Sequence, residues 1–249
     1  MANGPRQSRL PYSTGESVTD VILEQESVKV AILVPTHETI PAWFAYSLGL
    51  AMGYMGKNHP EVDVTLYFSN GTILSEQRTK LAKIALREGA HWTIWLDSDM
   101  RFPANTFERL LSHKAPIVGA GYPTRKIPCI EPTVYGDDGG KFRVYTDDSS
   151  TGTEAVFAMG FGVMCIHREV YETMPRPWFH IPWDDENEEQ ECGEDVFFCR
   201  KARETGFEVL LDHDLTKEVY HIGVAEFGYR DALSARPFIT EVRKNLEGK

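Results

Sequence analysis

Long hydrophobic runs are missing from this sequence of 249 residues. No stretch approaches the roughly 18 apolar residues that a membrane-spanning helix needs. The amino-terminal segment MANGPRQSRLPYSTGESVTD also lacks the apolar core of a secretory signal. We therefore expect a soluble protein that has no membrane partner and works in the cytoplasm.

Cysteine and positive charge are also scarce. The four cysteines show no CxxC spacing, which disfavours a zinc site and favours free thiols: Cys129, Cys165, Cys192 and Cys199. The 26 Lys and Arg residues against 37 Asp and Glu give a net charge of -11. This balance argues against a surface that binds nucleic acid through phosphate contacts alone, although it leaves a local basic groove open.

Apolar residues make up 42% of the chain and aromatic residues 11%, enough for a substantial core. Residues 1–27 are polar and contain Gly, Pro and Ser, so we expect a flexible arm there and a single domain over 28–249. Within this domain, short apolar strands alternate with amphipathic helices, which predicts an α/β fold with a mostly parallel central sheet flanked by helices. The strands are expected at 28–35, 62–70, 91–97 and 115–122, and the helices at 41–56, 76–89 and 105–114.

Local signals place the ends of these elements. Thr39 is expected to cap the first helix and Ser75 the second, which should stop at Gly89. After Tyr122 the chain becomes rich in turns and strand-like, which predicts an antiparallel portion. A helix over 195–206 should follow, and then short strands at 207–215 and 219–223.

Polar residues follow the expected strands. Ligands bind open parallel sheets at the carboxyl ends of the strands, and here these ends are Pro35–Glu38, Ser69–Asn70 and Asp97–Asp99. The last follows the apolar run WTIWL, and burying unpaired carboxylates there would be costly. Asp97 and Asp99 are therefore either solvated loop acids or the ligands of one divalent ion completed by water and phosphate oxygens.

Three further features have both a structural and a functional interpretation. Glu194 and Asp195 begin a helix, where they could stabilise its first turn or supply a general base whose pKa is raised by neighbouring acids. His221 could be a core histidine or a metal ligand, with His213 as its rival. The third feature is the pair Arg125 and Lys126, which follows a strand and could meet a phosphate or lie in a solvated loop.

Several motifs in one order resemble those of GT-A fold glycosyltransferases, the broad family-two enzymes and their phage-type soluble relatives. Over about residues 28–223 they are AILVPTHE, SEQRTKLAKIALREGAHWTIWLDSDM, FAMGFGVMCIHREVYE, GEDVFFCRKARETGFEV and YHIG. The resemblance implies a Rossmann-like sheet with an antiparallel acceptor side. It also implies metal-dependent transfer of a sugar from a nucleotide-diphosphate sugar to a hydroxyl acceptor.

The resemblance also implies roles for residues. The catalytic residues would be Asp195 and its neighbour Glu194: Asp195 would be the base if the reaction inverts the anomeric carbon, and would position the substrates if the reaction retains its configuration. A Mn²⁺ or Mg²⁺ ion would be held by Asp97, Asp99 and His221. The donor would contact Pro35, Thr36, Glu38, Asn70, Arg78, Asp97 and Gly160, with the glycine permitting close approach of sugar or acceptor. Two departures are visible: THE stands where many relatives have a Tyr-Asn pair, and no Gln-x-x-Arg-Trp motif occurs, so transfer of a single sugar is expected.

The acceptor and two other functional classes stay open at this point. A saccharide is the preferred acceptor, and a hydroxymethylated base in phage-type DNA is the alternative, which would place a phage-encoded protein in the host cytoplasm. A GT-A domain that binds nucleotide sugar or glycan without turnover is a further possibility. A haloacid-dehalogenase-type phosphatase fits less well, because its Asp-x-Asp pair would lie near the amino terminus, whereas here two strands precede it.

Overall fold

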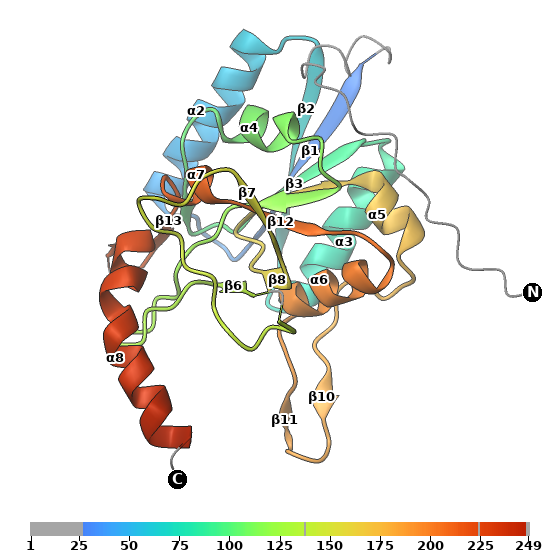
Figure 1. Cartoon of the computed structure of the whole chain (residues 1–249). Helices are drawn as coiled ribbons and strands as arrows, with labels where there is room; N and C mark the ends of the chain where they lie inside the picture. The colour runs from blue at the N-terminus through green and yellow to red at the C-terminus, as the bar shows by residue number, and fades with distance from the viewer. Residues whose placement is uncertain (1–26, 137, 224, 248–249) are drawn as a thin grey trace, which may run out of the picture.

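The computed structural model describes residues 27–136, 138–223 and 225–247. At its centre lies a seven-stranded sheet with the order β2-β1-β3-β9-β5-β12-β7 (Figure 1). Its strands are β1 (Val28–Thr36), β2 (Val62–Asn70), β3 (Trp92–Leu96), β5 (Ile117–Gly119), β7 (Thr153–Val156), β9 (Val163–His167) and β12 (Val209–Asp212).

Most strands of this sheet run in one direction. The ladders β1–β2, β1–β3 and β5–β12 are parallel, whereas β9 is antiparallel to both β3 and β5, and β7 is antiparallel to β12. Strands β2, β1, β3, β5 and β12 therefore point the same way, with β9 and β7 reversed. This confirms the predicted α/β class with its mostly parallel sheet and antiparallel portion.

Helices cover both faces of the sheet and enclose two cores. One face packs against α3 (Leu74–Arg87), α5 (Arg168–Thr173) and α6 (Glu194–Glu204). The other packs against α2 (Ala42–Asn58), α4 (Thr106–Ser112) and α7 (His213–Thr216). Alternate residues of a strand serve opposite cores: Leu33 of β1 faces the first, and its neighbours Ile32 and Val34 face the second.

Shorter elements surround the carboxyl edge of the sheet. They are β4 (Met100–Arg101), β13 (Tyr220–Ile222) and β14 (Glu226–Phe227) in one small sheet, β6 (Val134–Tyr135) and β8 (Ala158–Met159) in another, and the hairpin β10 (Trp183–Asp184) with β11 (Glu189–Gln190). The last helix is α8 (Tyr229–Glu247). Figure 1 shows α8 and the β10–β11 hairpin extending away from the central sheet.

Three predictions about element ends were wrong. Helix α2 begins at Ala42, and its N-cap is Pro41, in extended conformation, not Thr39. Helix α3 already begins at Leu74 after the extended residue Ile73, so Ser75 lies inside its first turn.

The third error concerns the strand expected over 207–215. Strand β12 ends at Asp212, because the Asp212 carboxylate accepts a hydrogen bond from the Leu215 amide and caps the short helix α7. The expected stop of α3 is confirmed: Gly89 follows it with φ +81°.

The predicted arm at 1–27 falls almost entirely on residues outside the described ranges, and the single domain over 28–249 stays a prediction. Within the described ranges, no helix has the length and apolar character needed to cross a membrane. All four cysteines lie in these ranges and are free thiols. The chain therefore builds one central sheet without covalent cross-links between its cysteines.

Candidate active site

The end of β3 explains how the chain accommodates the first acid of the Asp-x-Asp pair. Arg78, from the middle of α3, donates from Nη2 to Asp97 Oδ1 at 2.8 Å and from Nε to Glu194 Oε1 at 3.0 Å. The Arg78 side chain is only 2% exposed. A single buried guanidinium thus joins the end of β3, α3 and the start of α6, and Asp97 is a partly exposed acid paired with it.

Arg78 is held rigidly. Its guanidinium lies 5.0 Å from the ring centre of Phe161 and 5.6 Å from that of Trp95. Burial lowers the pKa of Arg78, but the charges of Asp97 and Glu194 outweigh burial and raise it above its ordinary value, so the group stays charged. Arg78 Nη1 is buried and has no hydrogen-bond partner among the described residues, which leaves one donor unused beside the site.

The second acid, Asp99, has a different environment. Its Oδ2 atom lies 3.0 Å from Arg125 Nη2 and 3.3 Å from His221 Nε2. The Ile222 amide donates to the Asp99 carbonyl at 2.7 Å, which brings β13 and its His221 against the acid. Burial alone would raise the pKa of Asp99, but the hydrogen bond with His221 and the charges of His221 and Arg125 lower it overall.

The ring of His221 is oriented for a cation. Its Nδ1 atom lies 2.8 Å from the Pro123 carbonyl, which can only accept, so Nδ1 carries a proton. In the neutral ring, Nε2 then presents a lone pair toward Asp99 Oδ2. Such a lone pair beside a carboxylate oxygen is an arrangement that can ligate a metal ion.

These residues fit a divalent ion in part. Asp99 and His221 lie together, and an imidazole with a carboxylate suits Mn²⁺ or Mg²⁺ when phosphate oxygens and water complete the shell. Asp97 is the exception, because Arg78 holds its Oδ1 atom. Among the described residues no group of three or more His, Cys, Asp or Glu side chains is arranged to hold a metal. The metal site therefore stays a prediction.

His213, the rival ligand, lies in a structural network. Its Nδ1 atom is 2.9 Å from Thr146 Oγ1 and its Nε2 atom is 2.9 Å from Glu154 Oε2. Both ring nitrogens are thus engaged, and the side chain is 7% exposed. His213 has no nitrogen left for a metal ion.

Glu194 and Asp195 occupy the first turn of α6, as predicted. Glu194 is buried against Arg78, whereas Asp195 accepts a hydrogen bond from the Val196 amide at 2.7 Å. Burial, and then the charge of Glu194, raise the pKa of Asp195 to about 6, despite the opposing effects of Val196 and Arg78. Asp195 therefore has the pKa of a general base that works near neutral pH.

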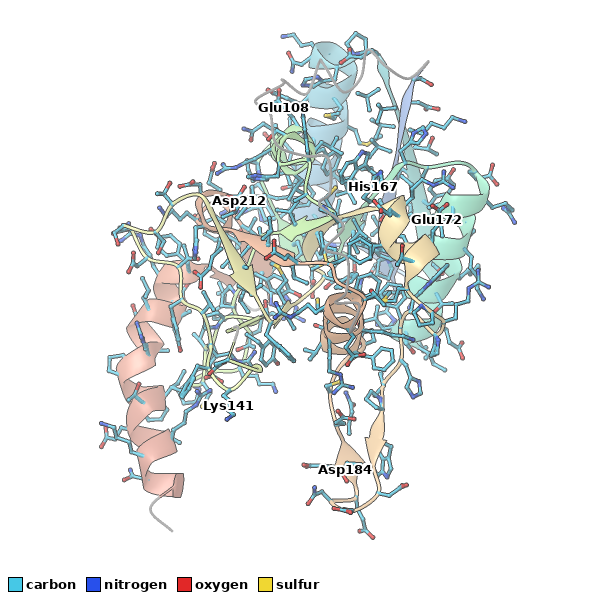
Figure 2. All side chains as sticks on the ribbon, turned by 45° about the vertical axis from the view of Figure 1, so that its right-hand side comes forward. Glu108, Lys141, His167, Glu172, Asp184 and Asp212 are labelled. Carbon is cyan, nitrogen blue, oxygen red and sulfur yellow. The ribbon has the colours of Figure 1, made fainter. Side chains whose placement is uncertain are left out.

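The acidic loop before α6 does not produce this shift. Residues of the loop form the β10–β11 hairpin, whose Asp184 lies at the far end of the molecule in Figure 2. Only Glu194, among the acids that immediately precede Asp195, is a cause of the raised pKa. The predicted like-charge effect is therefore limited to this one neighbour.

Gly160 has a different role from the predicted one. A Cβ atom at Gly160 would lie 2.3 Å from Tyr122 Oη, so the ring of Tyr122, and not a sugar, takes the space that glycine leaves. Tyr122 is buried, its hydroxyl lies 3.5 Å from Asp97 Oδ2, and its ring meets His221 edge-on. Burial, followed by the charge of Asp97, raises its pKa well above the ordinary value, so Tyr122 is a neutral donor between the two acids.

A hollow lies at the ends of β1 and β2. It is lined by His37, Glu38, Thr39, Asn70, Gly71 and Thr72. Two of the predicted donor residues, Glu38 and Asn70, thus share one open pocket. Strand β1 continues to Thr36, and within it Pro35 is buried and Thr36 half-buried. These two residues do not line the hollow as predicted.

Gln77 shapes this hollow, and nothing in the sequence pointed to it beyond its place one residue before Arg78. Its Oε1 atom accepts from the Thr36 amide at 3.1 Å, and its Nε2 atom donates to the Gly71 carbonyl at 3.0 Å. One buried amide side chain therefore clamps the ends of β1 and β2. Tyr122, also missed, could have been suspected only from its position after a strand.

A scan against protein-family models and a search of curated proteins found no match. Among solved structures, the chain is similar to A197 from STIV, with a TM-score of 0.52 and 16% identity over 79% of this chain and 86% of that one. A weaker likeness was found to the inositol-1-phosphate CTP transferase from T. maritima, with a TM-score of 0.39 and 10% identity over 76% of this chain and 86% of that one. Another was found to a glycosyltransferase involved in the glycosylation of the major capsid of PBCV-1, with a TM-score of 0.30 and 14% identity over 60% of this chain and 69% of that one. At these identities the similarity concerns the fold, a Rossmann-like mixed α/β sheet.

Proposed function

We propose that this protein is a GT-A glycosyltransferase that moves one sugar from a nucleotide-diphosphate sugar to a hydroxyl acceptor. One observation supports this most: at the carboxyl edge of the sheet, an acid–imidazole pair suited to a cation lies beside a carboxyl with a raised pKa. Asp99 and His221 form the first, and Asp195 is the second. Arg78 connects the two regions, because it bonds Asp97, two residues before Asp99, and Glu194, the residue before Asp195.

The donor diphosphate would lie at Asp99 and His221, which would hold a divalent ion. Such an ion, when bound, neutralises the diphosphate and makes it a better leaving group. The nucleoside would then extend into the hollow lined by Glu38 and Asn70. Arg78 is too buried to receive the diphosphate through Nη2 or Nε, both of which are bonded, so its role is to fix Asp97 and Glu194.

Asp195 would remove the proton from the attacking hydroxyl. Its raised pKa keeps the carboxylate basic enough to accept a proton while leaving it ionised at neutral pH. The oxygen of the acceptor would form a bond to the anomeric carbon as the bond to the diphosphate breaks, with inversion. Gly193 leaves room for the Asp195 carboxylate, because a Cβ atom at residue 193 would lie 2.6 Å from Asp195 Oδ1.

The Asp-x-Asp pair of a haloacid-dehalogenase phosphatase would need a free nucleophilic carboxylate. Asp97 does not provide one, because its Oδ1 atom is bonded to a buried guanidinium. A domain that only binds nucleotide sugar would not need a carboxyl with a raised pKa at Asp195. Both alternatives are therefore weaker than the transferase.

A saccharide is the proposed acceptor, and one feature favours the DNA alternative. A hollow beside α3 is lined by the cationic residues Lys80, Lys83 and Arg87, together with the acid Glu76, in a protein of net charge -11. Two other cations, Arg125 and Arg143, are engaged elsewhere, the first with Asp99 and the second against the ring of Tyr135. Transfer to hydroxymethylated duplex DNA, lost in Lys80→Glu/Lys83→Glu, would establish the alternative.

The test is release of nucleoside diphosphate from a panel of nucleotide sugars, with Mn²⁺ or Mg²⁺ and saccharide or DNA acceptors. The proposal expects acceptor-dependent release with one donor, absent in Asp195→Asn and retained in Asp63→Asn, a change on the exposed face of β2. Release that is the same in wild type and Asp195→Asn would contradict the assignment of the base. No release with any donor would contradict the transferase itself.

A further inference from the structure

Arg125 occupies the position beside Asp99 where a cation is expected. Its Nη2 atom lies 3.0 Å from Asp99 Oδ2, and its Nη1 atom donates to the Ile222 carbonyl at 2.7 Å. The same carboxylate oxygen faces His221. The guanidinium therefore neutralises the acid that would receive a divalent ion.

The surroundings are shaped to receive this arginine. A Cβ atom at Gly223 would lie 2.8 Å from Arg125 Cδ, so glycine at the end of β13 leaves room for the side chain. The backbone beside Arg125 is tied down: the Thr124 amide donates to the Glu131 carbonyl at 2.7 Å, and Thr124 Oγ1 donates to the Cys129 carbonyl at 3.2 Å. The arginine side chain itself is 43% exposed, so it can change rotamer while its backbone stays in place.

Arg125 and a divalent ion cannot share Asp99 Oδ2 without repulsion, because both are cations that need the same oxygen. A bound donor would supply a better partner for the arginine. The planar guanidinium matches two oxygens of a phosphate group, and such bonds are among the stronger ones in proteins. The exposed Arg125 side chain lies beside Asp99, where the diphosphate is predicted to bind.

We propose that Arg125 is a diphosphate-binding residue that leaves Asp99 when a divalent ion binds and then contacts the donor diphosphate. This rests on the proposed function, since it assumes a nucleotide-diphosphate donor. In the free protein Arg125 holds Asp99 ionised and in place. In the donor complex its charge would offset the phosphate oxygens that an ion held by Asp99 and His221 does not neutralise.

This exchange predicts opposite effects on two ligands. Calorimetric titration with MnCl₂ alone should show tighter binding in Arg125→Ala, by up to about fivefold, because the competing cation is gone. Titration with a nucleoside diphosphate in saturating Mn²⁺ should show binding about tenfold weaker or more, because a charged hydrogen-bond donor to phosphate is lost. The matching nucleoside monophosphate should lose less.

The matched control is Lys126→Ala, which removes a positive charge from the adjacent exposed residue. It should change both affinities less than twofold by long-range electrostatics, since screening is strong at the surface. Arg125→Lys keeps the charge without the planar fork and should restore the Mn²⁺ affinity of the wild type but only part of the diphosphate affinity. A thermal melt of each variant identifies any loss of fold.

The outcomes are separable. Opposite shifts in Arg125→Ala support the exchange. Affinities that are unchanged, or that both fall, would overturn it. They would mean that Arg125 only supports the loop, because removing a residue with that role alone would not strengthen Mn²⁺ binding. If the wild type binds Mn²⁺ but none of the four common nucleoside diphosphates, then the proposed function itself fails.

Discussion

The two acids of the Asp-x-Asp pair are separated by one residue and are similarly exposed, at 24% and 28%, but they pair with very different arginines. Asp97 is bonded to Arg78, whose side chain is 2% exposed and packed between aromatic rings. Asp99 faces Arg125, which is 43% exposed, and His221. The first half of the pair is bonded to a buried part of the fold, and the second half meets an exposed arginine, which is why the proposed metal and diphosphate chemistry is assigned to Asp99.

The largest effect is expected at Asp195, the proposed base. Asp195→Asn removes the proposed base and should lower kcat by about 10²- to 10⁴-fold, the range that general-base catalysis contributes. Donor affinity should stay within about twofold of the wild type, because Asp195 contacts Val196 and not the donor hollow. Steady-state kinetics with a separate binding titration check this, and a loss confined to donor affinity would contradict the role of base.

A change to the buried partner of Asp97, Arg78, should act mainly on stability. Arg78→Met leaves Asp97 and Glu194 without their counter-ion and should lower the free energy of unfolding by about 3–5 kcal/mol. Arg87→Met is the matched control on the same helix, since the Arg87 side chain is 74% exposed, and it should cost less than about 1 kcal/mol. Urea unfolding of both variants checks this, and equal stabilities would show that the buried triad contributes no more than a surface pair.

The pH dependence sharpens the same comparison. Because Asp195 has a pKa of about 6 in the folded protein, kcat/KM should rise with pH and level off above that value. The raised pKa also means that the folded state binds this proton more tightly than the unfolded chain does. Ionisation of Asp195 therefore lowers stability as pH rises from about 4 toward the folded pKa.

Asp195→Asn should remove this stability loss. Its free energy of unfolding relative to the wild type should improve between pH 4 and pH 7, with no change from pH 7 to pH 8. Thermal melts across this range provide the measurement. A relative stability that is flat with pH, together with kcat/KM that does not vary between pH 5 and pH 7, would show that the carboxyl has an ordinary pKa.

The smallest effect concerns the tyrosine between the two acids. Gly160→Ala places a methyl group 2.3 Å from Tyr122 Oη, which should cost about 1–3 kcal/mol by overpacking. The double variant Gly160→Ala/Tyr122→Leu should recover part of this loss, because the clashing ring is gone. Additive losses in unfolding experiments would contradict the contact.

Local patterns predicted the architecture well because they depend on neighbours in sequence. Short apolar runs in β1 and β3 predicted strands, and helical spacing in α3 predicted the helix that carries Arg78. The antiparallel insertion of β9 between β3 and β5 could not be predicted residue by residue, since it depends on pairing across the whole sheet.

The residues of the candidate site were predicted better than the contacts between them. Asp99, His221 and Asp195 stand out by residue type and by position at element ends. The partners that determine their chemistry are distant in sequence: Glu194 from Arg78, Tyr122 from Gly160, and Arg125 from Asp99. Such pairs depend on how the elements pack, and a list of motifs does not contain that information.

The most direct test of this account is a thermal-shift titration of four nucleoside diphosphates, with and without Mn²⁺, on the wild type and on Asp99→Ala. A ligand that binds only the native state adds roughly 2.7 kcal/mol at a hundredfold excess over Kd. The account predicts a Mn²⁺-dependent shift with one nucleotide in the wild type, and none in Asp99→Ala, whose melting temperature without ligand is nearly unchanged. An equal shift in both proteins would contradict the claim that Asp99 is the exchangeable half of the pair.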